Sequence, residues 1–227
     1  VSTRVGLLVP SSNTVVEADF YRSFPTSTTI HTARMLLETT TVEAEEAMLD
    51  EYTFPAARLL ATAKPDLMVF ACTSAGALRG NSYDDDLCNR ITEISGVPTI
   101  SVIRSVQRVL GEASGNSVAV LTPYVDELNQ RIQASLEDDG FNVTAMHGMG
   151  ITTNFDIAQV DPLAIKAFAQ ECFGKEPPAD SLFVSCTNFQ AVTARPMLQE
   201  LYGIPVVTSN HAALEVVRRA LSINSIA

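Results

Sequence analysis

The sequence has no tryptophan, only three histidines and few cationic side chains for its 227 residues. Fifteen lysines and arginines stand against 26 aspartates and glutamates, which gives a formal net charge of −11. Because nucleic acids and anionic membrane surfaces both select basic proteins, this balance argues against either partner. An acidic protein can still bind a small carboxylate where helix amino termini and backbone N–H groups supply local positive potential.

Long apolar runs are also missing. No stretch reaches the roughly 20 apolar residues that a membrane-spanning helix needs, and no signal-like amino terminus is recognised. Apolar residues make up 46% of the sequence and charged residues 18%, a balance typical of soluble α/β proteins. We therefore expect a cytoplasmic protein with no membrane partner.

The motifs that hold common cofactors are absent as well. Gly148-Met-Gly150 lacks the third glycine of a dinucleotide-binding loop, and neither a phosphate loop nor a His-Glu-x-x-His zinc motif occurs. The four cysteines have neither Cys-x-x-Cys nor zinc spacing. We assign the acidic run Asp84-Asp85-Asp86 to the first turn of a helix, where carboxylates favour the helix dipole, and not to a metal site. The sequence thus predicts chemistry without a metal or a cofactor.

One stretch occurs twice. The first copy runs from Asp66 to Ala77 and the second from Asp180 to Ala191, and the two aspartates lie as far apart (180−66 = 114) as Cys72 and Cys186 (186−72 = 114). Each copy is a short apolar run followed by Cys-Thr and then by small or polar residues. Its length suits a buried strand. The repeat indicates a duplicated chain.

Apolar runs alternate with amphipathic segments, which predicts an α/β fold with parallel sheets and right-handed crossovers. Because of the duplication, we expect two pseudo-symmetric lobes, each a parallel sheet flanked by helices, with the active site between them. Residues 1–113 would form the first lobe and residues 114–209 the second, and a helix over 210–227 would pack back on the first. The expected strands are 5–9, 28–35, 67–71, 96–101, 118–123, 141–146, 180–185 and 203–209. We also expect one long helix over 40–60 that Pro55 kinks, and a loop over 148–156.

The two repeated cysteines are the candidate reactive groups. In parallel sheets ligands bind at the carboxyl ends of strands, so Cys72 and Cys186 are expected to face one cleft. A thiolate is both a nucleophile and a base when its pKa falls below the free value of about 8.5, and we expect a helix start after each cysteine to lower it. Two such groups allow racemisation from opposite faces of a planar carbon. They also allow one sulfur to add to a carbon while the other handles a proton.

These features resemble the aspartate/glutamate racemase superfamily and, within it, the maleate cis-trans isomerases and arylmalonate decarboxylases. The stretch from Val9 to Thr14 is similar to the amino-terminal motif of maleate isomerases, whose asparagine contacts the substrate carboxylate; here it is Asn13. The resemblance also assigns two cysteines, an active-site tyrosine and a loop asparagine, which fall on Cys72, Cys186, Tyr124 and Asn154.

The resemblance implies a cofactor-independent isomerase of a small dicarboxylate, of the maleate-to-fumarate type, that works as a homodimer or homotetramer. In that reaction Cys72 adds as a thiolate to one alkene carbon and Cys186 acts as acid and base at the neighbouring carbon. The groups expected to hold the carboxylates are Asn13, Tyr124 and Asn154. The backbone N–H groups expected to stabilise the developing charge are those of Thr73, Ser74, Thr187 and Asn188.

Two alternatives in the family and one outside it stay open. The segments Thr73–Gly76 and Tyr124–Arg131 look closer to the decarboxylases, in which the Thr-Ser segment forms an oxyanion pocket. Decarboxylases, however, carry glycine where Cys72 stands, so the presence of both thiols favours a two-thiol reaction. The nearest alternative is a racemase of an α-substituted acid such as aspartate or a hydantoin-type compound, and a decarboxylase comes next. A non-catalytic binding module is the alternative from a different class.

Overall fold

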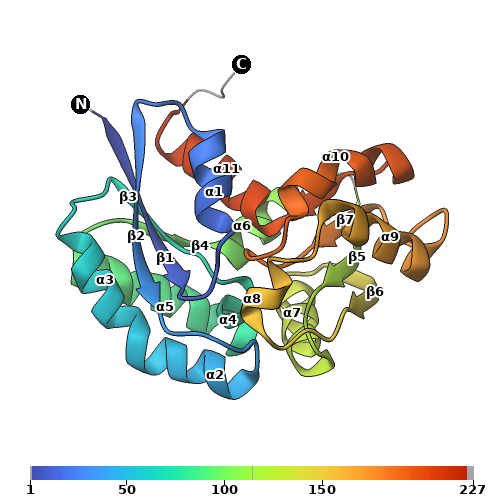
Figure 1. Ribbon diagram of the computed structural model, residues 1–227, viewed down its shortest axis with the longest axis horizontal. Coiled ribbons are helices and arrows are strands. Elements are labelled where there is room, and N and C mark those ends of the chain that lie inside the picture. The colour runs from blue at the N-terminus through green and yellow to red at the C-terminus, as the bar shows by residue number, and fades with distance from the viewer. Residues whose placement is uncertain (1, 114, 224–227) are drawn as a thin grey trace.

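The computed structural model describes residues 2–113 and 115–223, and within them the strands form two four-stranded parallel sheets (Figure 1). The strand orders are β2-β1-β3-β4 and β6-β5-β7-β8, so the second sheet repeats the topology of the first. The strands are β1 (Thr3–Pro10), β2 (Thr28–Met35), β3 (Leu67–Phe70), β4 (Thr99–Ser101), β5 (Ser117–Thr122), β6 (Asn142–Gly148), β7 (Ser181–Val184) and β8 (Val206–Thr208). The predicted α/β fold, with a parallel sheet in each of two similar halves, is confirmed.

Helices flank both sheets. They are α1 (Val16–Ser23), α2 (Val42–Ala47), α3 (Thr53–Ala61), α4 (Thr73–Leu78), α5 (Asn81–Ser95), α6 (Val102–Gly111), α7 (Asp126–Asp138), α8 (Asn154–Ile157), α9 (Pro162–Phe173), α10 (Ala191–Tyr202) and α11 (Ser209–Ala220). The last helix, α11, packs against α6 and α1. Residue 114 at the expected boundary and residues 224–227 of the expected final helix lie outside the described residues, and the division at 113/114 stays a prediction. Within the described residues, no helix combines the length and apolar character needed to cross a bilayer.

The strands beneath the repeated cysteines are buried over their whole length. All four residues of β3 and all four of β7 are buried, because each strand lies inside its sheet with helices on both faces. A continuous apolar run suits such a strand better than alternation does. This is why the two copies of the repeat could be recognised as strands, and their carboxyl ends fix where the cysteines lie.

The expected helix over 40–60 differs in one detail. Thr41 caps its start by accepting a hydrogen bond from the N–H of Ala44 at 3.3 Å. The interruption is a π-helical turn, η1 (Met48–Tyr52), and it precedes Pro55. Pro55 has no N–H to donate to the carbonyl four residues earlier, so the preceding turn widens. The expected loop over 148–156 also ends early, because Asn154 begins the short helix α8.

Asp84 lies in the first turn of α5, as the sequence predicted. It is fully buried in α5, and its Oδ2 accepts a hydrogen bond from the hydroxyl of Ser101. Burial raises the pKa of Asp84 to about 7, because the apolar surroundings disfavour the carboxylate. The folded protein therefore holds a proton on Asp84 over a pH range in which the unfolded chain has lost it.

From this we predict how stability depends on pH. Between about pH 4 and pH 7 the folded state binds one more proton at Asp84, so the free energy of unfolding falls as pH rises through that window. In an Asp84→Asn variant this fall should be smaller by on the order of a few kcal/mol. Urea unfolding of both proteins at pH 4.5 and pH 7.5 measures the difference. Parallel pH profiles would contradict the prediction.

Candidate active site

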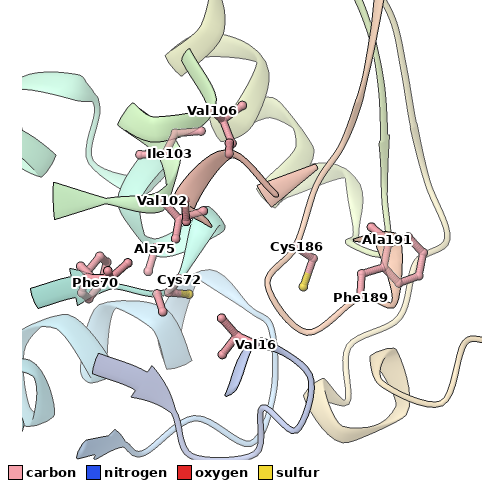
Figure 2. Close-up of a cluster of buried hydrophobic side chains, with 14 of the residues drawn as sticks. Val16, Phe70, Cys72, Ala75, Val102, Ile103, Val106, Cys186, Phe189 and Ala191 are labelled. Atoms are coloured by element: carbon pink, nitrogen blue, oxygen red, sulfur yellow. The ribbon is translucent and has the colours of Figure 1, made fainter. Parts of the chain in front are cut away.

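The structure brings the two repeated cysteines together. Cys72 follows β3 and is the N-cap residue of α4, and Cys186 follows β7 at the equivalent place in the second sheet. Figure 2 shows both sulfurs directed into the space between the two loops that carry them. A charge on Cys186 is among the causes that raise the pKa of Cys72, which is consistent with their closeness. Each residue is only 4% exposed.

The prediction that helix starts lower both thiol pKa values is wrong. Burial, followed by the charge on Glu45, raises the pKa of Cys72 well above its ordinary range. Burial also raises the pKa of Cys186 to about 12, although hydrogen bonds with Tyr124 and with the Asn188 N–H act in the opposite direction. Cys186 does not precede a helix directly, because α10 begins only at Ala191. In this buried site the loss of water outweighs the backbone dipoles.

The backbone at Cys186 is unusual. Its φ is 100°, in a region that residues with a side chain rarely adopt. Hydrogen bonds hold it there, since its N–H donates to Ser209 Oγ at 3.0 Å and its Sγ accepts from the Asn188 N–H at 3.3 Å. Such conformations cost free energy and cluster at functional sites.

Asn13 joins the two halves of the site. Its Oδ1 accepts from the N–H groups of Val15 and Val16 at 3.0 and 3.1 Å, at the start of α1. Its Nδ2 donates to Thr187 Oγ1 at 3.0 Å, and the Thr187 hydroxyl donates in turn to the Ala71 carbonyl at 3.0 Å. The amino-terminal motif thus holds the loop that carries the second cysteine.

Asn188 and Asn154 form a second link. Asn188 Nδ2 donates to the Asn154 carbonyl at 2.6 Å, and Asn188 Oδ1 accepts from the Thr14 N–H at 2.9 Å. Asn154 Nδ2 donates to Ser12 Oγ at 2.8 Å. Both predicted asparagines therefore meet the amino-terminal motif from the opposite half of the chain.

Tyr124 is 1% exposed and lies against Cys186, with which its hydroxyl is hydrogen bonded. Burial raises the pKa of Tyr124 well above its ordinary value, so the hydroxyl keeps its proton. Thr122 Oγ1 accepts from the Tyr124 N–H at 3.0 Å and donates to Asn129 Oδ1 at 2.5 Å. Gly148 packs so closely that a Cβ there would lie 2.3 Å from the Tyr124 carbonyl oxygen. The position of the tyrosine is thus set by its neighbours.

The Thr-Ser segment after Cys72 leads to two residues that the sequence analysis missed. Thr73 Oγ1 donates to Ser209 Oγ at 2.9 Å, and this same Ser209 oxygen accepts from the Cys186 N–H. The Ser74 hydroxyl donates to Glu45 Oε1 and lies 3.9 Å from Cys72 Sγ. Ser209 fell at the end of the expected strand 203–209 and begins α11 directly after β8, but nothing in the sequence gave it a role. No signal separated Glu45 from the other glutamates of its helix.

Both sulfurs are buried, whereas the sequence predicted that they face a cleft. Segment 38–40, which precedes α2, is hydrogen bonded to segment 151–154, which leads into α8. Thr40 N–H donates to the Thr152 carbonyl at 2.7 Å, and Asn154 N–H donates to the Glu38 carbonyl at 2.9 Å. These bonds, with those of Asn188 and Asn154, tie the two halves of the chain together next to the cysteine loops.

Among residues 2–113 and 115–223 no cluster of three or more histidine, cysteine or acidic side chains is arranged to hold a metal ion. The arrangement found is instead two thiols, a tyrosine hydroxyl and a carboxyl group, surrounded by amide and hydroxyl groups. Chemically, it offers a nucleophile, proton donors and neutral hydrogen-bond donors.

Comparison with known proteins assigns the family. A family model of arylmalonate decarboxylase matches residues 5–227. The chain belongs to the arylmalonate decarboxylase family. Its relatives include arylmalonate decarboxylase of Bordetella bronchiseptica, 27% identical with 92% of this chain and 86% of the relative covered. Maleate isomerase of Geobacillus stearothermophilus is 23% identical, with 98% of this chain and 93% of the relative covered.

Solved structures show the same architecture for this member of the arylmalonate decarboxylase family. A cysteine mutant of the Nocardia farcinica maleate cis-trans isomerase, with a covalently bound succinylcysteine intermediate, superposes with a TM-score of 0.88. The two are 23% identical, and the match covers 98% of this chain and 94% of the isomerase. At this identity the likeness establishes the fold. Because the relatives named here are enzymes, we assign the chain as an enzyme.

Proposed function

We propose that the protein is a cofactor-independent cis-trans isomerase that converts a small dicarboxylate of the maleate type to its trans isomer. The observation that carries this proposal is the pair of thiols, Cys72 and Cys186, in one enclosed site at equivalent strand ends. The decarboxylases that the sequence resembles carry glycine in place of the first thiol. The succinylcysteine found in the Nocardia farcinica isomerase supports addition of a cysteine to a four-carbon dicarboxylate.

The reaction uses the two sulfurs in turn. Cys72, as a thiolate, forms a C–S bond to one alkene carbon, and Cys186 gives its proton to the neighbouring carbon. The former double bond is then single and rotates. Return of the proton to Cys186 and departure of Cys72 restore the alkene in the trans form. The raised pKa of Cys186 keeps it protonated for this role, and because burial also raises the pKa of Cys72, we place its ionisation before the site closes.

Neutral donors would hold the substrate. We propose that Asn13, Tyr124 and Asn154 bind its carboxylates by exchanging hydrogen bonds that they now make within the protein. Backbone N–H groups around each sulfur would stabilise the enolate-like charge; we assign this to Thr73, Ser74, Thr187 and Asn188. The contacts between segments 38–40 and 151–154 would exclude water during the reaction.

The test is to incubate the protein with maleate and follow the alkene protons by NMR. We expect the maleate signal to be replaced by that of fumarate without any added cofactor. Absence of fumarate together with deuterium exchange at the α-carbon of aspartate or of a hydantoin would contradict the isomerase and favour the two-thiol racemase. A homodimer or homotetramer and a cytoplasmic location stay predictions.

A decarboxylase is the second candidate, because the Bordetella bronchiseptica decarboxylase is 27% identical and the Thr73-Ser74 segment resembles that of the decarboxylases. It comes second because the decarboxylases that the sequence resembles carry glycine where Cys72 stands, whereas this chain has both thiols. Release of carbon dioxide from phenylmalonate, with no fumarate formed from maleate, would favour the decarboxylase.

A further inference from the structure

Glu45 is a buried acid that the reaction described so far does not use. It lies in α2 between Glu43 and Glu46, which are both exposed, yet Glu45 itself is 0% exposed. The helix packs against α4, the helix that Cys72 caps. Burying a carboxyl group is costly unless it is paired or neutral, so its position calls for a physical explanation.

The contacts of Glu45 place it at the reacting sulfurs. Its Oε1 accepts from the hydroxyl of Ser74, which lies 3.9 Å from Cys72 Sγ. A charge on Glu45 is among the causes that raise the pKa of Cys72, Cys186 and Tyr124, so it lies near all three. Its Oε2 is buried and has no hydrogen-bond partner among the described residues.

Among residues 2–113 and 115–223, no cation balances a charge on this carboxyl group. No ion pair within the described residues includes Glu45, and Arg79 at the end of α4 binds Asp50 and Glu46 at the surface instead. The titratable groups that face Glu45 are two thiols and a phenol, all of which are acids. Burial accordingly raises the pKa of Glu45 to about 8. An anionic substrate beside an ionised Glu45 would add a second uncompensated charge.

We propose that Glu45 is a substrate contact that works as a carboxylic acid: its Oε2 donates a hydrogen bond to the substrate carboxylate beside Cys72, and ionisation of Glu45 turns that attraction into repulsion. The inference rests on the proposed function only in taking a small carboxylate as the substrate. It explains how a site without a lysine or arginine among its proposed residues binds an anion. It also predicts that the site selects anions only while Glu45 holds its proton.

The experiment compares two alkylating agents that differ in charge. The Cys72 thiolate attacks both iodoacetate and iodoacetamide. The ionisation of the thiol and the opening of the site therefore change both rates equally, and the ratio of the two rates does not depend on them. We would measure this ratio by peptide mass spectrometry from pH 6 to pH 9.5. In the wild-type protein the ratio of iodoacetate to iodoacetamide should fall by roughly tenfold or more as pH passes through about 8. In Glu45→Gln, a neutral donor of the same shape, it should not change with pH.

Glu43→Gln is the matched control, because it removes an exposed carboxylate from the same helix and should follow the wild type. A flat ratio in the wild type, or an equal fall in Glu45→Gln, would overturn the proposal. The wild-type profile decides alone if the variant does not fold. The alkylation ratio is independent of turnover. A ratio that falls with pH, without fumarate formation, would contradict only the isomerase proposal. Fumarate formation with a ratio that does not change with pH would contradict only the role of Glu45.

Discussion

Replacement of Cys72 by alanine is expected to abolish the conversion of maleate to fumarate, by at least about a thousandfold, since Cys72 forms the C–S bond in the proposed mechanism. Replacement of Cys186 should have an effect of the same size, because Cys186 delivers the proton to the second carbon in the proposed mechanism. The fold should survive, since each change removes one sulfur from a packed interior, a loss of about 1 kcal/mol. NMR of maleate measures the loss of activity in both variants, and thermal unfolding measures the loss of stability.

Cys88→Ala provides the control, because it removes a buried thiol from α5, outside the site. It should keep its activity and lose a similar amount of stability. Substantial turnover in either Cys72→Ala or Cys186→Ala, with the control active, would rule out the two-thiol mechanism. An isomerase that needs only one of them would then have to be considered.

Gly148→Ala is expected to lower activity at least tenfold without touching either sulfur. The new Cβ would lie 2.3 Å from both the Tyr124 carbonyl oxygen and Asn129 Nδ2, so the backbone at Tyr124 must shift. A displacement of about 1 Å at a group that contacts the substrate can cost about a hundredfold in rate. The strain should also lower the free energy of unfolding by roughly 1–3 kcal/mol. Steady-state kinetics and urea unfolding give the two values.

Gly111→Ala is a suitable control, because a Cβ at Gly111 meets nothing within 4 Å and the residue ends α6 with an ordinary φ. It should leave kcat unchanged and cost no stability. If Gly148→Ala were as active as this control, the tight packing around Tyr124 would have no part in the reaction.

Most of the fold could be predicted because apolar runs mark buried parallel strands. The runs before Cys72 and Cys186 form β3 and β7, and their equal offset in the sequence indicates the duplication. The sequence predicted that the helix over 42–61 is interrupted at Pro55, but the interruption lies earlier, at Met48–Tyr52. Sequence shows where Pro55 lacks a donor, but it does not show that the chain widens the preceding turn in response.

The site was predicted less completely, because burial depends on contacts between distant segments. Glu45 looks like the exposed glutamates beside it, and only the packing of α2 on α4 reveals it. The contact between segments 38–40 and 151–154 was missed for the same reason, since nothing in either segment indicates that the two meet. The thiol pKa values then followed from burial, which a strand-and-helix pattern does not encode.

The backbone at Cys186 has an evolutionary consequence. At a φ of 100° glycine would be the less strained occupant, so selection for stability alone would remove this sulfur. Under the proposed mechanism, the conformational penalty is tolerated because this backbone directs the Cys186 sulfur at the substrate. Relatives that no longer need this thiol should often have glycine at this position, and replacing the cysteine by glycine should raise their free energy of unfolding.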